Sequence, residues 1–246
     1  MTLRASMCVL ALAIVAAACD NAPGHRSIET YVAPDKVLDF RGLYAANCAG
    51  CHGAEGRGGA ALGLANPTYL AVASDDVIRR AIAKGIPHTP MPAFSRRAGG
   101  MLTDQQVEVL VTGMRAEWAK PSAAGSELPP YAEASPGDVQ RGGALFANGC
   151  ASCHGNGNHG SSHASAIVDG SYLALVSNQG LRTTIIVGRP DLGAPDWRGN
   201  LPGRVMTSQD VADVVAWLAA QRPPFAGTPY EQTARIDPSR PIEVHP

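Results

Sequence analysis

Two short cysteine motifs hold the residues of this 246-residue chain that are best suited to chemistry. The first is Cys48-Ala49-Gly50-Cys51-His52, and the second is Cys150-Ala151-Ser152-Cys153-His154. In a C-x-x-C-H motif the two thiols lie close enough to add to the two vinyl groups of one haem, and the adjacent histidine can then bind the iron from one face. Each copy therefore predicts a covalent haem c site.

A pair of cysteines two residues apart can also hold zinc or form a redox-active dithiol. Neither alternative accounts for the histidine that follows the second cysteine in both copies. A zinc site built from two cysteine pairs would also need compact spacing, whereas Cys51 and Cys150 are separated by most of a domain. The pattern favours two covalently bound haem c groups, with thioether bonds at Cys48, Cys51, Cys150 and Cys153 and with His52 and His154 as iron ligands.

The segments around the two motifs are copies of one another, which indicates an internal duplication. Apolar residues with helical spacing lead into each motif, a second helix closed by glycine follows, and a threonine is placed to cap a final amphipathic helix. This order predicts an all-α fold with two similar domains. The matched strips are Leu43 and Tyr44 on Leu145 and Phe146, residues 69–85 on 172–188, and Thr103 on Thr207.

The duplication places the first domain at residues 35–118 and the second at 137–222. Residues 119–136 between them are rich in proline, alanine and serine, which predicts a linker of semi-stiff character. A proline-containing tail follows at residues 223–246. Lys and Arg number 20 against 21 Asp and Glu, and this near balance gives no indication of a nucleic-acid partner.

The beginning of the chain has the pattern of an export signal, with Arg4, an apolar run and then Cys19. The run is much shorter than the roughly 20 residues of a transmembrane helix. Residues 15–19 resemble a bacterial lipoprotein cleavage box, which predicts a signal peptide at residues 1–18, lipid on Cys19 and a tether at residues 19–34. The protein is then anchored on the periplasmic side of a bacterial membrane. The alternative is an ordinary secreted protein that keeps Cys19 as a free thiol.

The order of helix, C-x-x-C-H motif, glycine-rich turn, second helix, Met-Pro loop and final helix resembles class I cytochrome c. Two such units in tandem are similar to the arrangement of the di-haem cytochromes c4. The resemblance covers nearly all of residues 35–222. It implies a buried haem that supplies much of each domain's core, and a carrier of single electrons. The partners that it implies are a quinol-oxidising complex, a haem-copper oxidase or a dehydrogenase.

The resemblance also implies a methionine as the second axial ligand of the iron. In the first repeat Met91 lies in the Met-Pro loop and is the candidate, with His88 close to it in sequence. A thioether ligand opposite histidine raises the reduction potential. In the second repeat the ungapped alignment places Ala194 where Met91 stands, and alanine cannot bind iron.

Three outcomes therefore remain open for the second haem. Met206, which stands opposite Leu102 beside the cap of the last helix, could reach the iron. The distal position could stay open, or take water or an exogenous ligand. His159 or His163 could bind, although both follow His154 in a turn expected on the same side of the haem.

The distal position of the second haem also separates the possible functions. An electron carrier needs no catalytic residue, whereas an open site would suit a haem enzyme or a ligand sensor. A third possibility is a cytochrome subunit of a dehydrogenase or oxidase complex. Arg189, Arg198 and Arg204 are candidates for pairing with haem propionates, with ordinary surface arginines as the alternative.

Overall fold

The computed structural model describes residues 31–87, 89–120, 128–157 and 160–223. The expected signal peptide, Cys19, His88, His159 and nearly all of the C-terminal tail lie outside these residues. The chain divides after Val37 into two units, and each is described by itself. In the first unit the described residues form one 3-10 turn, η1 (Pro34–Lys36). The second unit contains both cysteine motifs.

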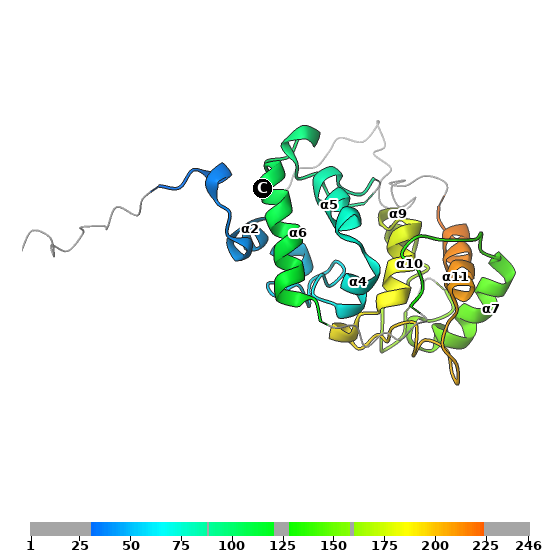
Figure 1. Ribbon diagram of the computed structural model, residues 1–246. Coiled ribbons are helices and arrows are strands. Elements are labelled where there is room, and N and C mark those ends of the chain that lie inside the picture. The colour runs from blue at the N-terminus through cyan, green and yellow to red at the C-terminus, as the bar shows by residue number, and fades with distance from the viewer. Residues whose placement is uncertain (1–30, 88, 121–127, 158–159, 224–246) are drawn as a thin grey trace, which may run out of the picture. The chain divides into compact units, whose positions relative to one another are not determined.

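The first repeat is built from helices whose starts are capped by side chains (Figure 1). Asp39, Asn66, Ser74 and Thr103 each accept a hydrogen bond from a backbone N–H of the first turn, which satisfies a donor that has no partner inside the helix. The elements are α2 (Phe40–Asn47), α3 (Ala49–His52), α4 (Pro67–Val72), α5 (Asp75–Lys84), η2 (Arg96–Ala98) and α6 (Asp104–Trp118).

The second repeat has α-helices in the same order, but its 3-10 turn precedes Ala194, whereas η2 of the first repeat follows Met91. Asp138, Asp169, Ser177 and Thr207 cap its longer helices and α9 in the same way. The part of the chain that the structure describes contains no strand, so the predicted all-α fold is confirmed. The elements are α7 (Val139–Gly149), α8 (Ala151–His154), α9 (Gly170–Leu175), α10 (Asn178–Val187), η3 (Pro190–Leu192) and α11 (Ser208–Ala220).

The first and last helices of the second repeat, α7 and α11, pack closely against each other (Figure 1). A Cβ atom on Gly142 would lie 1.9 Å from the carbonyl oxygen of Asp213, so only glycine allows this approach. The rings of Phe146 and Trp217 lie beside this contact, with centroids 4.4 Å apart. The helix α7 ends at Gly149, directly before the first cysteine of the motif.

The same crossing in the first repeat has its large and small residues exchanged. Phe40 of α2 is the counterpart of Gly142, and Gly113 of α6 is the counterpart of Trp217. A Cβ atom on Gly113 would lie 2.3 Å from the ring of Phe40. Each repeat therefore combines a glycine on one helix with an aromatic ring on the other, and only the assignment to helices differs.

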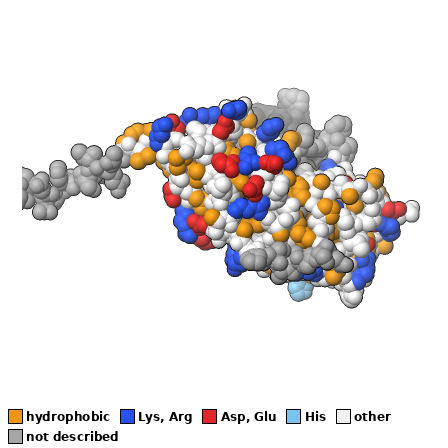
Figure 2. Space-filling view, viewed as in Figure 1, with side chains coloured by type: hydrophobic (Ala, Val, Ile, Leu, Met, Phe, Trp, Pro, Cys, Tyr) orange, Lys and Arg blue, Asp and Glu red, His pale blue; other side chains and the backbone are white. Residues whose placement is uncertain are grey.

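The surface over α5 and α6 carries acidic and basic side chains next to one another, as Figure 2 shows. Arg79 pairs with Asp76 and Glu108 there, and Arg115 pairs with Asp75. This face presents mixed charge rather than a field of one sign. Among the described residues, no helix has both the length and the apolar character needed to cross a membrane.

We expect Gly142→Ala to destabilise the protein by about 1–3 kcal/mol, because the added methyl group must push α7 away from α11. Chemical unfolding of the haem-loaded protein, followed by far-UV circular dichroism, measures this change. Gly50→Ala is the control, since a Cβ there meets nothing within 4 Å. Equal stability of the two variants would contradict the close crossing.

Candidate haem sites

Each cysteine motif forms a one-turn helix directly after the first helix of its repeat. The N–H of Cys48 donates to the carbonyl of Tyr44, and that of Cys150 donates to Phe146, both at 2.8 Å. Burial raises the pKa of the Cys48 and Cys150 thiols to about 11, with a smaller contribution from the neighbouring thiol. Cys51 and Cys153 are exposed, and none of the four motif cysteines forms a disulfide bond.

The motif histidines are oriented by the same hydrogen bond in both repeats. Nδ1 of His52 lies 2.7 Å from the carbonyl oxygen of Leu62, and Nδ1 of His154 lies 2.8 Å from that of Ser165. A carbonyl can only accept, so Nδ1 carries the proton and the lone pair of Nε2 is left for a metal. Burial lowers the pKa of His52, and the positive charge of Arg189 lowers it further. The arrangement keeps the imidazole neutral and directed.

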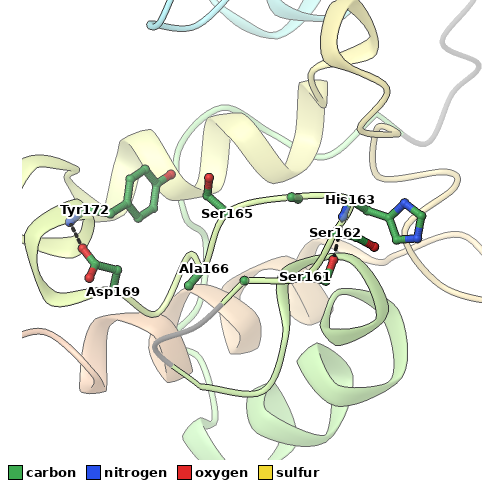
Figure 3. A pocket seen from close by; sticks show the side chains of 9 residues that line it. Ser161, Ser162, His163, Ser165, Ala166, Asp169 and Tyr172 are labelled. Carbon is green, nitrogen blue, oxygen red and sulfur yellow. Dashed lines mark hydrogen bonds between the residues drawn. The ribbon is translucent and has the colours of Figure 1, made fainter.

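An open cavity of about 740 Å³ lies against the loop that holds His154. Ser165, Asp169 and Tyr172 line it, and Figure 3 shows the Tyr172 ring on the same side as Ser165. The cavity has the size of a cofactor or ligand site. It lies beside the loop whose Ser165 carbonyl orients His154, and its lining residues do not include His154 or either motif cysteine.

The loops after α5 and α10 share a backbone hydrogen bond at equivalent positions, and the second loop also contains η3. The N–H of Ile86 donates to Met91 at 3.1 Å, and the N–H of Arg189 donates to Ala194 at 3.0 Å. Gly85 and Gly188 open these loops with φ values of 68° and 65°. A Cβ atom on either glycine would clash with the backbone of the loop residues that follow it. Ala194 therefore occupies the backbone position of Met91, which is half-buried.

Met206 occupies the position of Leu102. The N–H of Met206 donates to the carbonyl of Trp197 at 3.0 Å, as the N–H of Leu102 donates to that of Phe94 at 2.7 Å. The two residues are 3% and 4% exposed. The structure thus places Met206 in a buried position next to the cap of α11, the position that Leu102 has in the first repeat.

His163 lies on an exposed loop. Its N–H donates to Oγ of Ser161 at 3.0 Å, and Figure 3 shows its imidazole directed away from Tyr172. The residue is exposed and is among those that line the cavity. The other two candidate histidines, His88 and His159, are not among the described residues.

The donors present in each repeat fit a haem c group. Two free thiols and a directed imidazole occur together in both, and the second repeat adds a buried donor. Trp197 is 2% exposed, and its Nε1 has no partner among the described residues. A buried N–H without a partner is costly, and a haem propionate would satisfy it.

The three arginines of the second distal segment pair with aspartates rather than standing free for a propionate. The guanidinium of Arg198 also stacks over the Trp197 ring, with its central carbon 4.7 Å from the centroid. The sequence indicated the arginines and missed the aspartates, because aspartates in a Pro-Gly-rich loop look like ordinary turn residues. The pairs are Arg189 with Asp191, Arg198 with Asp196, and Arg204 with Asp210.

The Arg189–Asp191 pair also bonds to the turn that follows the first motif. Asp191 accepts from the N–H of Gly58 at 2.9 Å, and Arg189 donates to the carbonyl of Gly59 at 2.7 Å. Asn66 donates to the carbonyl of Val187 at 2.9 Å. The loop that carries Ala194 is therefore tied to the loop that holds His52.

The Asp191 contacts predict an acid-sensitive contribution to stability. The hydrogen bond from Arg189 and, to a smaller extent, the N–H of Gly58 together lower the pKa of Asp191 to about 2, against an opposing effect of burial. Its unfolded value is about 3.9, so the stabilisation is complete above that pH and is lost as pH falls toward 2. Asp191→Asn should flatten the pH dependence of the unfolding free energy between pH 4 and 2.

Unfolding in urea at pH 7, 4 and 2.5 measures this dependence. Asp196→Asn is the matched control, since Asp196 pairs with Arg198 of the same loop. A pH profile of Asp191→Asn that equals that of the wild type would contradict the contribution.

The chain was compared with curated proteins and with solved structures. None of the curated proteins matches the chain. A chain of the reducing HAO-like protein complex of Kuenenia stuttgartiensis is similar at 16% identity and a TM-score of 0.44, covering 78% of this chain and 98% of that one. Thiosulfate dehydrogenase TsdBA from Marichromatium purpuratum, in its as-isolated form, is similar at 20% identity and a TM-score of 0.30, covering 88% of this chain and 53% of that one.

The family described as cytochrome C oxidase, cbb3-type, subunit III matches residues 35–112 and 137–218. The two matched stretches each contain one cysteine motif, one directed histidine and one distal loop. Because the match spans both repeats and more than half of the chain, the chain belongs to this family of cytochrome c domains.

Proposed function

We propose that this chain is a di-haem c-type cytochrome that carries single electrons between partner proteins on the periplasmic side of a bacterial membrane. The directed histidine in each repeat carries the proposal, because Nε2 of His52 and of His154 is left free to bind iron. Haem supplies the one-electron redox change when it is bound. Met91 completes the coordination in the first repeat.

The residues of each repeat contribute to electron transfer by holding and shielding the group. The motif thiols attach it, and the carbonyls of Leu62 and Ser165 fix the imidazoles. The core around α6 and α11 excludes water, which influences the reduction potential. Quinol-oxidising complexes, haem-copper oxidases and dehydrogenases are the partners that suit such a carrier, through small and transient contacts.

The number of haems tests the proposal. The wild-type protein should contain two haems per chain by the pyridine haemochrome assay, and they should titrate as two one-electron steps. A variant that combines Cys150→Ala with Cys153→Ala should retain one covalent haem, because the Cys48 and Cys51 thiols are untouched. Ser152→Ala is the control and should retain two. A single haem in the wild type would contradict the di-haem proposal.

The lipid anchor is a separate part of the proposal. It rests on Cys19 directly after an apolar run in the sequence. Cys19→Ser should move the protein from the membrane fraction to the soluble fraction, whereas Cys8→Ser, within the expected signal peptide, should leave it in the membrane fraction. Fractionation of expressing cells followed by haem staining measures this. Retention of Cys19→Ser in the membrane fraction would contradict lipid anchoring.

A haem enzyme or ligand sensor is the second candidate function, and Ala194 is the observation that favours it. The distal loop of the second repeat keeps the backbone of the first loop while it lacks the methionine. No residue is assigned a catalytic role on this basis.

A further inference from the structure

The distal loop of the second repeat lacks a donor side chain at the place where the first repeat has one. The hydrogen bonds from Ile86 to Met91 and from Arg189 to Ala194 put both loop residues in the same backbone position. The side chain of Ala194 is a methyl group, which has no lone pair. The loop therefore keeps its shape without supplying an axial ligand.

Met206 does not replace the missing donor from where it lies. Its N–H is bonded to Trp197, and the following Thr207 forms a capping box with Asp210 that starts α11. Leu102 has the same backbone bond and the same burial in the first repeat, although a leucine cannot bind iron. The position is thus a core position in both repeats, and moving the Met206 thioether to a metal would empty it.

His163 is also placed unsuitably. It is exposed on the segment between His154 and Ser165, whose carbonyl orients the proximal imidazole. His163 is among the residues that line the cavity, and Figure 3 shows its ring directed away from Tyr172. A histidine on this segment approaches from the side that His154 occupies.

The geometry points to an open coordination position at the second haem that binds a small neutral ligand such as carbon monoxide or nitric oxide. This inference rests on the proposed attachment of haem at Cys150 and Cys153. The three arginines of the second distal segment, Arg189, Arg198 and Arg204, are already paired with aspartates. Because no unpaired positive charge is left on them for an anion, a neutral ligand is favoured. Binding forms one dative bond from the lone pair of the ligand, and no electron is transferred.

Carbon monoxide binding to the dithionite-reduced, haem-loaded protein tests the inference. The Soret band should shift with a stoichiometry of one carbon monoxide per chain that carries two haems. Binding of none by the wild type would overturn the inference. Haem content, measured on the same samples by the pyridine haemochrome assay, reports separately on the proposed function.

The test variants exchange residues between equivalent positions of the two repeats. Ala194→Met places the methionine of the first loop in the second loop. It should lower the number of carbon monoxide molecules bound per chain from one to zero. Met206→Leu places the residue of the first repeat at the core position and should leave it at one. Met91→Ala should raise it to two, since the first loop then lacks its donor.

Other results would identify a protein side chain as the ligand of the second haem iron. If Met206→Leu binds carbon monoxide and the wild type does not, Met206 is the ligand and the inference fails. If His159→Ala or His163→Ala is required for binding, a histidine is the ligand and the inference also fails. Two ligands bound per wild-type chain would support the open second site and contradict the role of Met91. Far-UV circular dichroism checks that each variant is folded.

Discussion

A hydrogen bond from the imidazole of the motif histidine to a backbone carbonyl is the constraint on which each repeat depends. The carbonyl of Leu62 lies 10 residues after His52, and that of Ser165 lies 11 residues after His154. The chain must therefore turn back within one loop, while the preceding helix must end at the first cysteine. Helix packing sets the second condition, and the loop sets the first. Together they leave Nε2 of each motif histidine without the carbonyl contact that Nδ1 makes.

The packing of the first helix on the last shows how two divergent repeats meet this condition. A close crossing needs one small residue at the contact, and either helix can provide it. The first repeat places Phe40 on α2 and Gly113 on α6, whereas the second places Gly142 on α7 and Trp217 on α11. The volume at the crossing is thus kept although the identities are exchanged. Both solutions end the first helix at the motif cysteine.

The sequence predicted what depends on local pattern, and it missed what depends on distant partners. Helical spacing, the cysteine motif and the capping threonines are local, so the all-α fold and the register of Ala194 on Met91 could be read in advance. The contact of Asp191 with Gly58 joins residues 133 positions apart, and nothing in the sequence near either residue indicates it. The exchange of glycine and aromatic residue between the two repeats, which gives Gly142 and Trp217 in the second, was missed for the same reason. It can be recognised only from the packing of the two helices.

The distal loops explain how one repeat can lack an axial methionine and still fold. Their shape depends on the positive φ of Gly85 and Gly188 and on backbone hydrogen bonds, none of which requires a thioether. The position of Ala194 is therefore free to change without loss of structure. Arg189, at the start of this loop, also bonds to the turn that follows His52 and lowers the pKa of that histidine. A ligand that displaces the second loop would consequently act on the electrostatics of the first site through two hydrogen bonds and one charge.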